Sequence, residues 1–150
     1  MNPVLRDGQR EDFRSICQIW RAAWEATFPQ IDFVARLPML QSLLEAAEAG
    51  QYAVRLALQD GEPAGFTLLE VKSGLLEQIA VHPSYWGYGI SDRLVGDAAR
   101  IADAQLHLIV NQENQRAVRF YIRMGFGIVG EGTNRNSQRP TFLMRWNEQE

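Results

Sequence analysis

The segment from residue 79 to residue 94 contains residue types and spacing that could bind a phosphate. A predicted strand ends at Val81, and Gly87 and Gly89 precede a predicted helix start at Ile90. The first N–H groups of a helix have no partner within the helix, and with the helix dipole they favour an anion such as a pyrophosphate. Glycines let a ligand approach the backbone closely. The segment is consistent with a phosphate site, although an isolated Gly-x-Gly is also typical of a structural turn.

A dinucleotide-binding turn is a second functional interpretation of this segment. Its pattern, Gly-x-Gly-x-x-Gly, needs a third glycine, and Asp92 stands at that position. The pattern also expects an acidic residue at the end of the next strand, whereas Val110 is followed by Asn111. Both departures disfavour a nicotinamide or flavin site.

The same segment resembles the coenzyme-binding motif of the GNAT superfamily of N-acetyltransferases, an Ala-Val-x-Pro strand end followed by Arg/Gln-x-x-Gly-x-Gly/Ala. The matching positions are Ala80, Val81, Pro83, Gly87, Gly89, Ile90 and Leu94. Trp86 stands where the family usually has Arg or Gln, and Ser91 where it usually has Gly or Ala. The resemblance implies a coenzyme site that binds phosphate mainly through backbone N–H groups. Its predicted residues are Ile79, Ala80, Val81, Trp86, Gly87, Tyr88, Gly89, Ile90 and Ser91.

A second segment resembles the family signature Asn-x-x-Ala-x-x-Phe-Tyr-x-x-x-Gly-Phe at every specified position. The matching residues are Asn114, Ala117, Phe120, Tyr121, Gly125 and Phe126. The resemblance implies acetyl-CoA as cosubstrate, no metal, and direct attack by an amine in a ternary complex. It implies that Tyr121 protonates the departing thiolate and that Asn114 positions the pantetheine arm. A buried core tyrosine and a plain helix N-cap are the alternatives.

Acetyl transfer to an amine also needs a base, because an alkyl ammonium has a pKa near ~10. Glu77 precedes Ile79 by two residues, so in a regular strand it would share a face with Ile79 and Val81. Many family members place a carboxylate here, and a solvated strand charge is the alternative. The resemblance further implies that backbone N–H groups around residues 79–81 stabilise the oxyanion, where parallel strands splay.

Other polar and aromatic residues have weaker functional interpretations. His82 adjoins the glycine turn, but a surface histidine is the favoured interpretation. His107 alternates with apolar neighbours and is predicted to be structural. Tyr85, Trp86 and Tyr88 could stack on the adenine or line the acceptor cleft, and the sequence does not choose between these roles.

Periodicity predicts the elements that must position these residues. The longest helical stripe ends before Pro29 and comprises Phe13, Ile16, Cys17, Trp20, Trp24 and Phe28. Further helices are predicted around residues 40–47, 90–101 and 117–124, and strands near residues 4–6, 52–58, 64–70, 75–81, 106–110, 126–129 and 141–146. With the resemblance, this order predicts an α/β (α+β) fold, one GNAT domain over residues 1–150. We expect a mixed, mostly antiparallel sheet of about seven strands flanked by four helices.

Composition excludes several other classes of protein. The 150 residues carry a net charge of −3, which argues against a nucleic-acid partner. Cys17 is the only cysteine, and no spacing resembles a zinc site. The N-terminus lacks a basic segment followed by an apolar one, and no apolar run approaches the roughly 18 residues of a membrane span. We expect a cytoplasmic protein with no membrane partner, and the sequence leaves a homodimer open.

The acceptor amine is the open question at this level. A small-molecule amine is the first hypothesis, and a protein N-terminus or lysine is the second. A non-catalytic acyl-CoA sensor and an enzyme acting on charged tRNA are further alternatives. The acceptor cleft is expected between residues 21–40 and 133–141, where Glu25 and Asp32 could attract a cation.

Overall fold

A single twisted sheet organises the computed structural model, which describes residues 2–27, 32, 34–135 and 137–147. The seven strands follow the spatial order β1-β2-β3-β4-β5-β7-β6. Their bounds are β1 Val4–Asp7, β2 Ala53–Gln59, β3 Glu62–Glu70, β4 Leu75–Val81, β5 His107–Asn111, β6 Phe126–Thr133 and β7 Pro140–Trp146. The predicted order of elements and the mixed, mostly antiparallel sheet are confirmed.

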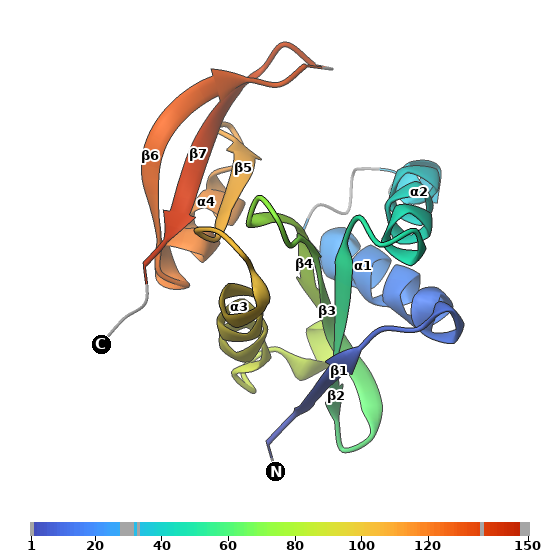
Figure 1. The fold of residues 1–150 in the computed structure, drawn as a ribbon. Helices are drawn as coiled ribbons and strands as arrows, with labels where there is room; N and C mark the ends of the chain where they lie inside the picture. The colour runs from blue at the N-terminus through green and yellow to red at the C-terminus, as the bar shows by residue number, and fades with distance from the viewer. Residues whose placement is uncertain (1, 28–31, 33, 136, 148–150) are drawn as a thin grey trace.

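Among the described strands, β4 and β5 are the one parallel pair, and they diverge (Figure 1). Their only paired residues are Leu75 and His107, at the beginning of each strand. Every other neighbouring pair is antiparallel and has at least four paired positions. The predicted splay is therefore present, and the last residues of β4 have no ladder partner on the β5 side.

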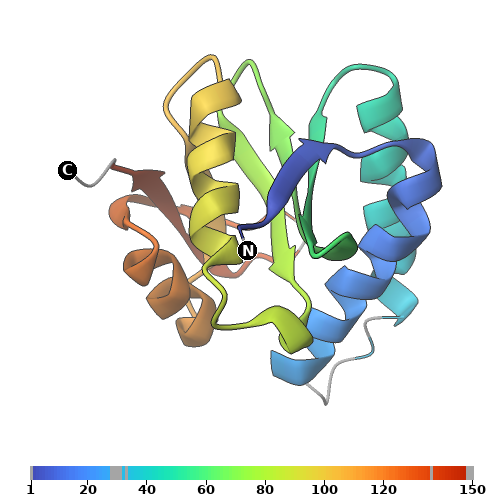
Figure 2. The same cartoon turned by 90° about the horizontal axis from the view of Figure 1, so that it is seen from below.

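Four helices cover the two faces of the sheet (Figure 2). Their bounds are α1 Phe13–Thr27, α2 Leu37–Glu48, α3 Ile90–Ile101 and α4 Gln115–Arg123. Short 3-10 turns are η1 Arg10–Asp12, η2 Val34–Arg36 and η3 Pro83–Tyr85. Helices α1 and α2 lie on one face, and α3 and α4 lie on the other. The apolar stripe of α1 is confirmed as far as the chain is described, and Phe28, its last predicted member, lies outside the described residues.

Each face of the sheet has its own hydrophobic core, because strand side chains alternate between the two faces. The α1–α2 core contains Ile16, Ile19, Trp20, Leu40, Leu44, Val54, Leu56, Phe66, Leu68 and Ala80. Members of the α3–α4 core include Leu69, Leu76, Ile79, Val81, Ile90, Leu94, Val118 and Phe126. Both cores contact β4, so this strand is held from both sides.

A buried ion pair ties α3 to the sheet. The Arg55 guanidinium of β2 donates to both carboxylate oxygens of Asp97 in α3, at 2.9 and 3.1 Å. Breaking such a buried pair leaves an uncompensated charge, which is strongly destabilising. The pair helps to keep α3 in one position above the sheet, and with it the turn before α3.

Strand β6 is longer than the sequence indicated. It extends to Thr133, whereas the apolar pattern predicts an end near Val129. The register between β6 and β7 shifts between Ile128 and Gly130, so Val129 is a bulge. The bulge breaks the two-residue alternation, and the remainder of the strand, Gly-Glu-Gly-Thr, carries little apolar signal.

Candidate active site

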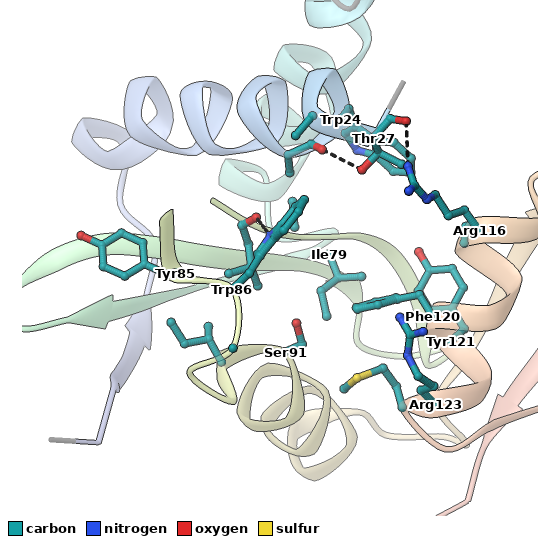
Figure 3. Close-up of a pocket in the computed structure, with 18 of the residues that line it drawn as sticks. Trp24, Thr27, Ile79, Tyr85, Trp86, Ser91, Arg116, Phe120, Tyr121 and Arg123 are labelled. Carbon is teal, nitrogen blue, oxygen red and sulfur yellow. Dashed lines mark hydrogen bonds between the residues drawn. The ribbon is translucent and has the colours of Figure 1, made fainter. Parts of the chain in front are cut away.

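A cleft of about 570 Å³ lies between α1, β4, the turn before α3, and α4 (Figure 3). Both segments singled out in the sequence contribute to it, although about 20 residues separate them along the chain. The predicted residues that line it are Ile79, Ala80, Val81, Trp86, Gly87, Gly89, Ile90, Ser91 and Tyr121. Further lining residues include Trp24, Thr27, Arg116, Phe120 and Arg123.

The glycine turn opens the N-terminus of α3 toward this cleft. Gly89 is the N-cap of α3 at φ 76°, and no side chain caps the helix there. Gly87 also has a positive φ, 90°. Apart from the glycine itself and its neighbours along the chain, no described atom lies within 4 Å of the place a Cβ would occupy at either position. The first N–H groups of α3 therefore face open space that an anion could fill.

Trp86 links this turn to the end of β4. Its indole Nε1 donates to the Val81 carbonyl oxygen at 2.8 Å, and about half of the residue, 52%, stays exposed. The side chain replaces the cation expected from the family motif with a structural hydrogen bond. Tyr85 lines the cleft beside it, whereas Tyr88 is 61% exposed and is not among the lining residues. A coenzyme contact by Tyr88 stays a prediction.

A bulge in β4 changes the predicted orientation of Glu77. Leu69 pairs with Leu76 and Leu68 pairs with Gln78, which leaves Glu77 without a partner in β3. Leu76 and Ile79 are three residues apart, yet both pack in the α3–α4 core. Regular alternation would place them on opposite faces.

The expectation that Glu77 shares a face with Ile79 and Val81 is therefore wrong. Gln78 accepts a hydrogen bond from Trp20 Nε1 of α1 at 3.1 Å, so it lies on the α1–α2 face. Glu77 lines a cavity together with Gln78 and with Trp24 of α1. Burial raises the pKa of Tyr52, which packs against the α1–α2 core, and the charge of Glu77 raises it further. Glu77 thus lies toward that face as well, and the bulge causes the change.

Glu77 lines a smaller cavity of about 230 Å³ between β4 and β5. Its polar lining residues are Glu77, Gln78, Asn111, Asn114, Tyr121, Asn134 and Thr141. Burial, and secondly the charge of Glu70, raise the pKa of Glu77 above its ordinary value. A carboxylate with a raised pKa is a stronger proton acceptor near neutral pH.

Tyr121 lies where the two cavities meet. Trp24, Ile79, Ala117 and Tyr121 line both of them. The Tyr121 ring packs edge-on against Phe120 and Phe126, with centroids 5.4 and 5.7 Å away. Burial raises the pKa of Tyr121 to about 12, so the phenol keeps its proton at neutral pH. A protonated hydroxyl between two cavities can donate to a group in either one.

Asn114 caps α4 through its side chain. Its Oδ1 accepts from the Ala117 N–H at 3.2 Å. The N-cap role, which the sequence gave as an alternative for this residue, is therefore confirmed. Asn114 also lines the smaller cavity, and its contact with a pantetheine arm stays a prediction.

Residues 13–126 match the acetyltransferase (GNAT) family. The chain belongs to this family. The prediction of an acetyl-CoA-dependent N-acetyltransferase is thereby confirmed, while the acceptor and the residue roles are not settled by family membership.

Curated relatives of this GNAT protein have named acceptors of two kinds. It is 29% identical over 140 residues to the peptidyl-lysine N-acetyltransferase YjaB of Salmonella typhimurium, which covers 93% of this chain and 94% of the relative. It is 28% identical over 144 residues to spermidine N(1)-acetyltransferase of Escherichia coli, covering 85% and 74% respectively. One relative is thus named for a protein acceptor and the other for a polyamine.

Solved structures share the fold of this GNAT protein. The PaiA N-acetyltransferase of Thermoplasma acidophilum, in complex with coenzyme A, has a TM-score of 0.76 at 19% identity over 99% of this chain and 100% of that one. The solution structure of apo YjaB from Escherichia coli has a TM-score of 0.73 at 22% identity, with 97% and 98% covered. At these identities the likeness supports the fold alone.

The polar side chains with weaker functional interpretations contact other groups of the protein. Glu25 pairs with Arg21 at 2.6 Å, and the Asp32 carboxylate accepts from the Ala35 N–H at 3.3 Å. The His82 ring accepts from the Ser84 N–H at 3.1 Å and so caps η3. The His107 ring nitrogen Nδ1 lies 2.9 Å from the Gln105 carbonyl oxygen. In the described part of the chain, none of these four side chains lines the two cavities.

Sequence reasoning missed Arg116, Phe120 and Arg123 as cleft residues and assigned Trp24 to the helix core. The spacing of Arg116, Phe120 and Arg123, four and then three residues, is that of one helix face. This signal was present, but only the structure shows which face of α4 meets the cleft.

Two kinds of feature are absent from the described residues: a metal-binding cluster and a membrane-spanning helix. They include no group of three His, Cys, Asp or Glu side chains able to hold a metal ion. No helix within the same ranges is long and apolar enough to cross a membrane.

Proposed function

We propose that this protein transfers the acetyl group of acetyl-CoA to the primary amine of a small molecule, by direct attack in a ternary complex. The observation that carries the proposal is the meeting of two cavities at Ile79 and Tyr121. One cavity begins at the open glycine turn, and the other contains Glu77. Coenzyme and acceptor can thus enter from different sides and meet at the same point.

The larger cavity has the features that a coenzyme A chain requires. Gly87 and Gly89 leave room beside the backbone for phosphate oxygens. Beyond Leu75, β4 has no paired residue in β5, so its edge can bond to the amides of a pantetheine arm. The same edge, at residues 79–81, offers N–H donors for the oxyanion that forms at the thioester carbon.

The smaller cavity fits the amine. Its volume, about 230 Å³, suits a compact substrate rather than a folded segment of protein. Glu77 is the only charged side chain among its described lining residues, and it attracts an ammonium group. The polyamine relative supports a small acceptor, whereas the peptidyl-lysine relative makes a lysine side chain the second candidate.

The proton transfers follow from these positions. Glu77 takes a proton from the ammonium group, directly or through water, and the free amine attacks the thioester carbon. As the carbon–sulfur bond breaks, Tyr121 donates its proton to the sulfur. The excess proton that the attacking nitrogen still carries is lost through water to the Tyr121 phenolate, which leaves a neutral amide and restores the hydroxyl. The raised pKa values of both groups suit these roles, because Glu77 becomes more basic and Tyr121 stays protonated.

A thiol-release assay tests the proposal. Purified protein is incubated with acetyl-CoA and one of several amines: monoamines, polyamines, amino acids, a peptide with a free N-terminus, or a blocked peptide with one lysine. We expect small amines to release CoA fastest, and CoA but not NAD to raise the melting temperature. Faster release with the lysine peptide would replace the small-molecule acceptor by a protein one. Release with no acceptor, or stabilisation by NAD alone, would contradict the proposed function.

A further inference from the structure

Helix α4 has an unusual charge. Its nine residues include Arg116, Arg119 and Arg123 and no acidic residue, in a chain whose net charge is −3. Ion pairs elsewhere use six other arginines, and none of the three in α4 pairs with a described acidic residue. The neighbouring Glu113 pairs instead with Arg139 at 3.0 Å. Helix α4 therefore carries three positive charges without a described counter-charge.

Two of these arginines face the coenzyme cleft and the third does not. All three side chains are exposed, but Arg116 and Arg123 line the cleft on the same side of α4 as Phe120, whereas Arg119 does not line it. Figure 3 shows Arg123 extending from α4 into the cleft near Phe120. Arg116 already donates to the Thr27 carbonyl oxygen at 3.3 Å. Arg123 makes no hydrogen bond to a described residue and is the freer cation.

The glycine turn before α3, on the opposite wall of the cleft, lacks a cationic side chain. From His82 to Asp92 the segment contains no Lys or Arg, and Trp86 occupies the place where the family motif expects Arg or Gln. The first arginine beyond it, Arg93, is exposed and does not line the cleft. Backbone N–H groups there can bind phosphate oxygens, but they supply no full positive charge. A polyphosphate bound there would need a full positive charge from residues outside this segment.

We propose that Arg123 supplies this charge by binding a phosphate group of coenzyme A across the cleft from the α3 N-terminus. The inference rests on the proposed function, because it presumes that coenzyme A occupies the cleft. A guanidinium offers several donors in one plane and suits phosphate oxygens well. A purely structural role for Arg123 is the alternative, because a cation in the last turn of a helix interacts favourably with the negative end of the helix dipole and stabilises the helix.

Calorimetric titration of full-length variants with three ligands tests the assignment. The ligands are CoA, dephospho-CoA without the 3′-phosphate, and pantetheine without any phosphate. We expect Arg123→Gln to weaken CoA binding about tenfold or more, the effect of losing a charge-assisted hydrogen bond. Arg123→Lys should recover part of the affinity. Arg119→Gln is the matched control on the same helix, and it should change the affinity by less than about twofold.

Comparison of the three ligands identifies which phosphate group Arg123 binds. If Arg123 binds the 3′-phosphate, the loss in Arg123→Gln disappears with dephospho-CoA. If it binds the pyrophosphate, the loss persists with dephospho-CoA and disappears with pantetheine. Either pattern supports the inference. A loss equal for all three ligands indicates a structural role and overturns it.

Two further outcomes are also decisive. Arg123→Gln that binds CoA like Arg119→Gln overturns this inference and leaves the proposed function standing. Wild-type protein that binds none of the three ligands overturns both. Melting temperatures of the ligand-free variants check that a loss of affinity is not a loss of fold.

Discussion

Two strand-to-helix junctions form part of the cleft, and they differ in how the N-terminus of the helix is capped. Between β4 and α3, the N-cap is Gly89, which has no side chain to offer. Between β5 and α4, the N-cap is Asn114, whose side chain binds the Ala117 N–H. The first junction leaves its N–H groups available to a ligand, and the second satisfies one of them internally.

This difference in the N-caps suits the two junctions to different tasks. The first can bind a ligand through its backbone, and the second can act through its side chains. At the β4–α3 junction the glycines matter because they expose the backbone. At the β5–α4 junction the functional candidates are side chains, Tyr121 and Arg123. Changes at the first junction should therefore alter coenzyme affinity, and Tyr121 at the second should alter turnover.

The largest effect is expected for Tyr121→Phe. The variant keeps the ring that packs on Phe120 and Phe126 but lacks the hydroxyl that donates to the leaving thiolate. Turnover should fall by about 10²- to 10⁴-fold, with little change in the affinity for acetyl-CoA and no recovery at high pH. Steady-state kinetics and coenzyme titration measure the two quantities. A loss of less than about threefold would remove Tyr121 from the mechanism.

Glu77→Gln should lower activity by a similar factor of about 10²- to 10⁴-fold at neutral pH. The pKa of Glu77 is raised, and only the deprotonated form accepts a proton, so wild-type kcat/KM falls as the pH drops through that raised pKa. The variant should lack this acid limb. Its activity should recover as the pH nears ~10, where the amine loses its proton unaided.

Glu70→Gln is the control for this pH profile. It removes the like charge that helps to raise the pKa of Glu77, so the acid limb should move to lower pH while the plateau stays the same. Wild-type kinetics in Glu77→Gln, with Tyr121→Phe still impaired, would show that water or another group takes the proton.

Gly89→Val should weaken CoA binding by at least about tenfold. The φ of 76° is unfavourable for a β-branched residue, with a strain of about 1 to 3 kcal/mol, and the added side chain enters the open space beside the turn. Calorimetry gives the affinity, and thermal unfolding gives the cost to the fold.

The control for Gly89→Val lies in the same helix. Gly96→Ala is in the α3 interior, where Ala is favoured over Gly by roughly 1 kcal/mol, and a Cβ there would meet no described atom within 4 Å outside its chain neighbours and the nearby backbone of α3. It should raise the melting temperature and leave the affinity for CoA unchanged. Equal affinities in folded Gly89→Val and Gly96→Ala would contradict the phosphate site.

The smallest effect is expected at Asn114. Asn114→Ala removes the cap of α4 and should destabilise the protein by about 0.5 to 2 kcal/mol. Asn114→Asp keeps an oxygen for the Ala117 N–H but has no amide donor. If Asn114 only caps α4, the Asp variant should match the wild type in both stability and CoA affinity. Weaker CoA binding by a fully stable Asp variant would show that the amide also contacts the coenzyme.

The sequence by itself determined the family, the order of the elements and the two glycines before α3, and it gave the Asn114 cap as an alternative to a coenzyme contact. These features are local: a motif, a periodicity or a cap depends on residues a few positions apart. The splay of β4 and β5 was also anticipated, although only through the resemblance.

Only the tertiary structure decided where several side chains lie. The bulge at Glu77 arises from the pairing of β4 with β3, so alternation along β4 alone gave the wrong face. The hydrogen bond from Trp86 to Val81 and the entry of Arg123 into the cleft likewise depend on how the turn and the helices pack. Register and packing are relations between distant segments, and no pattern within one segment contains them.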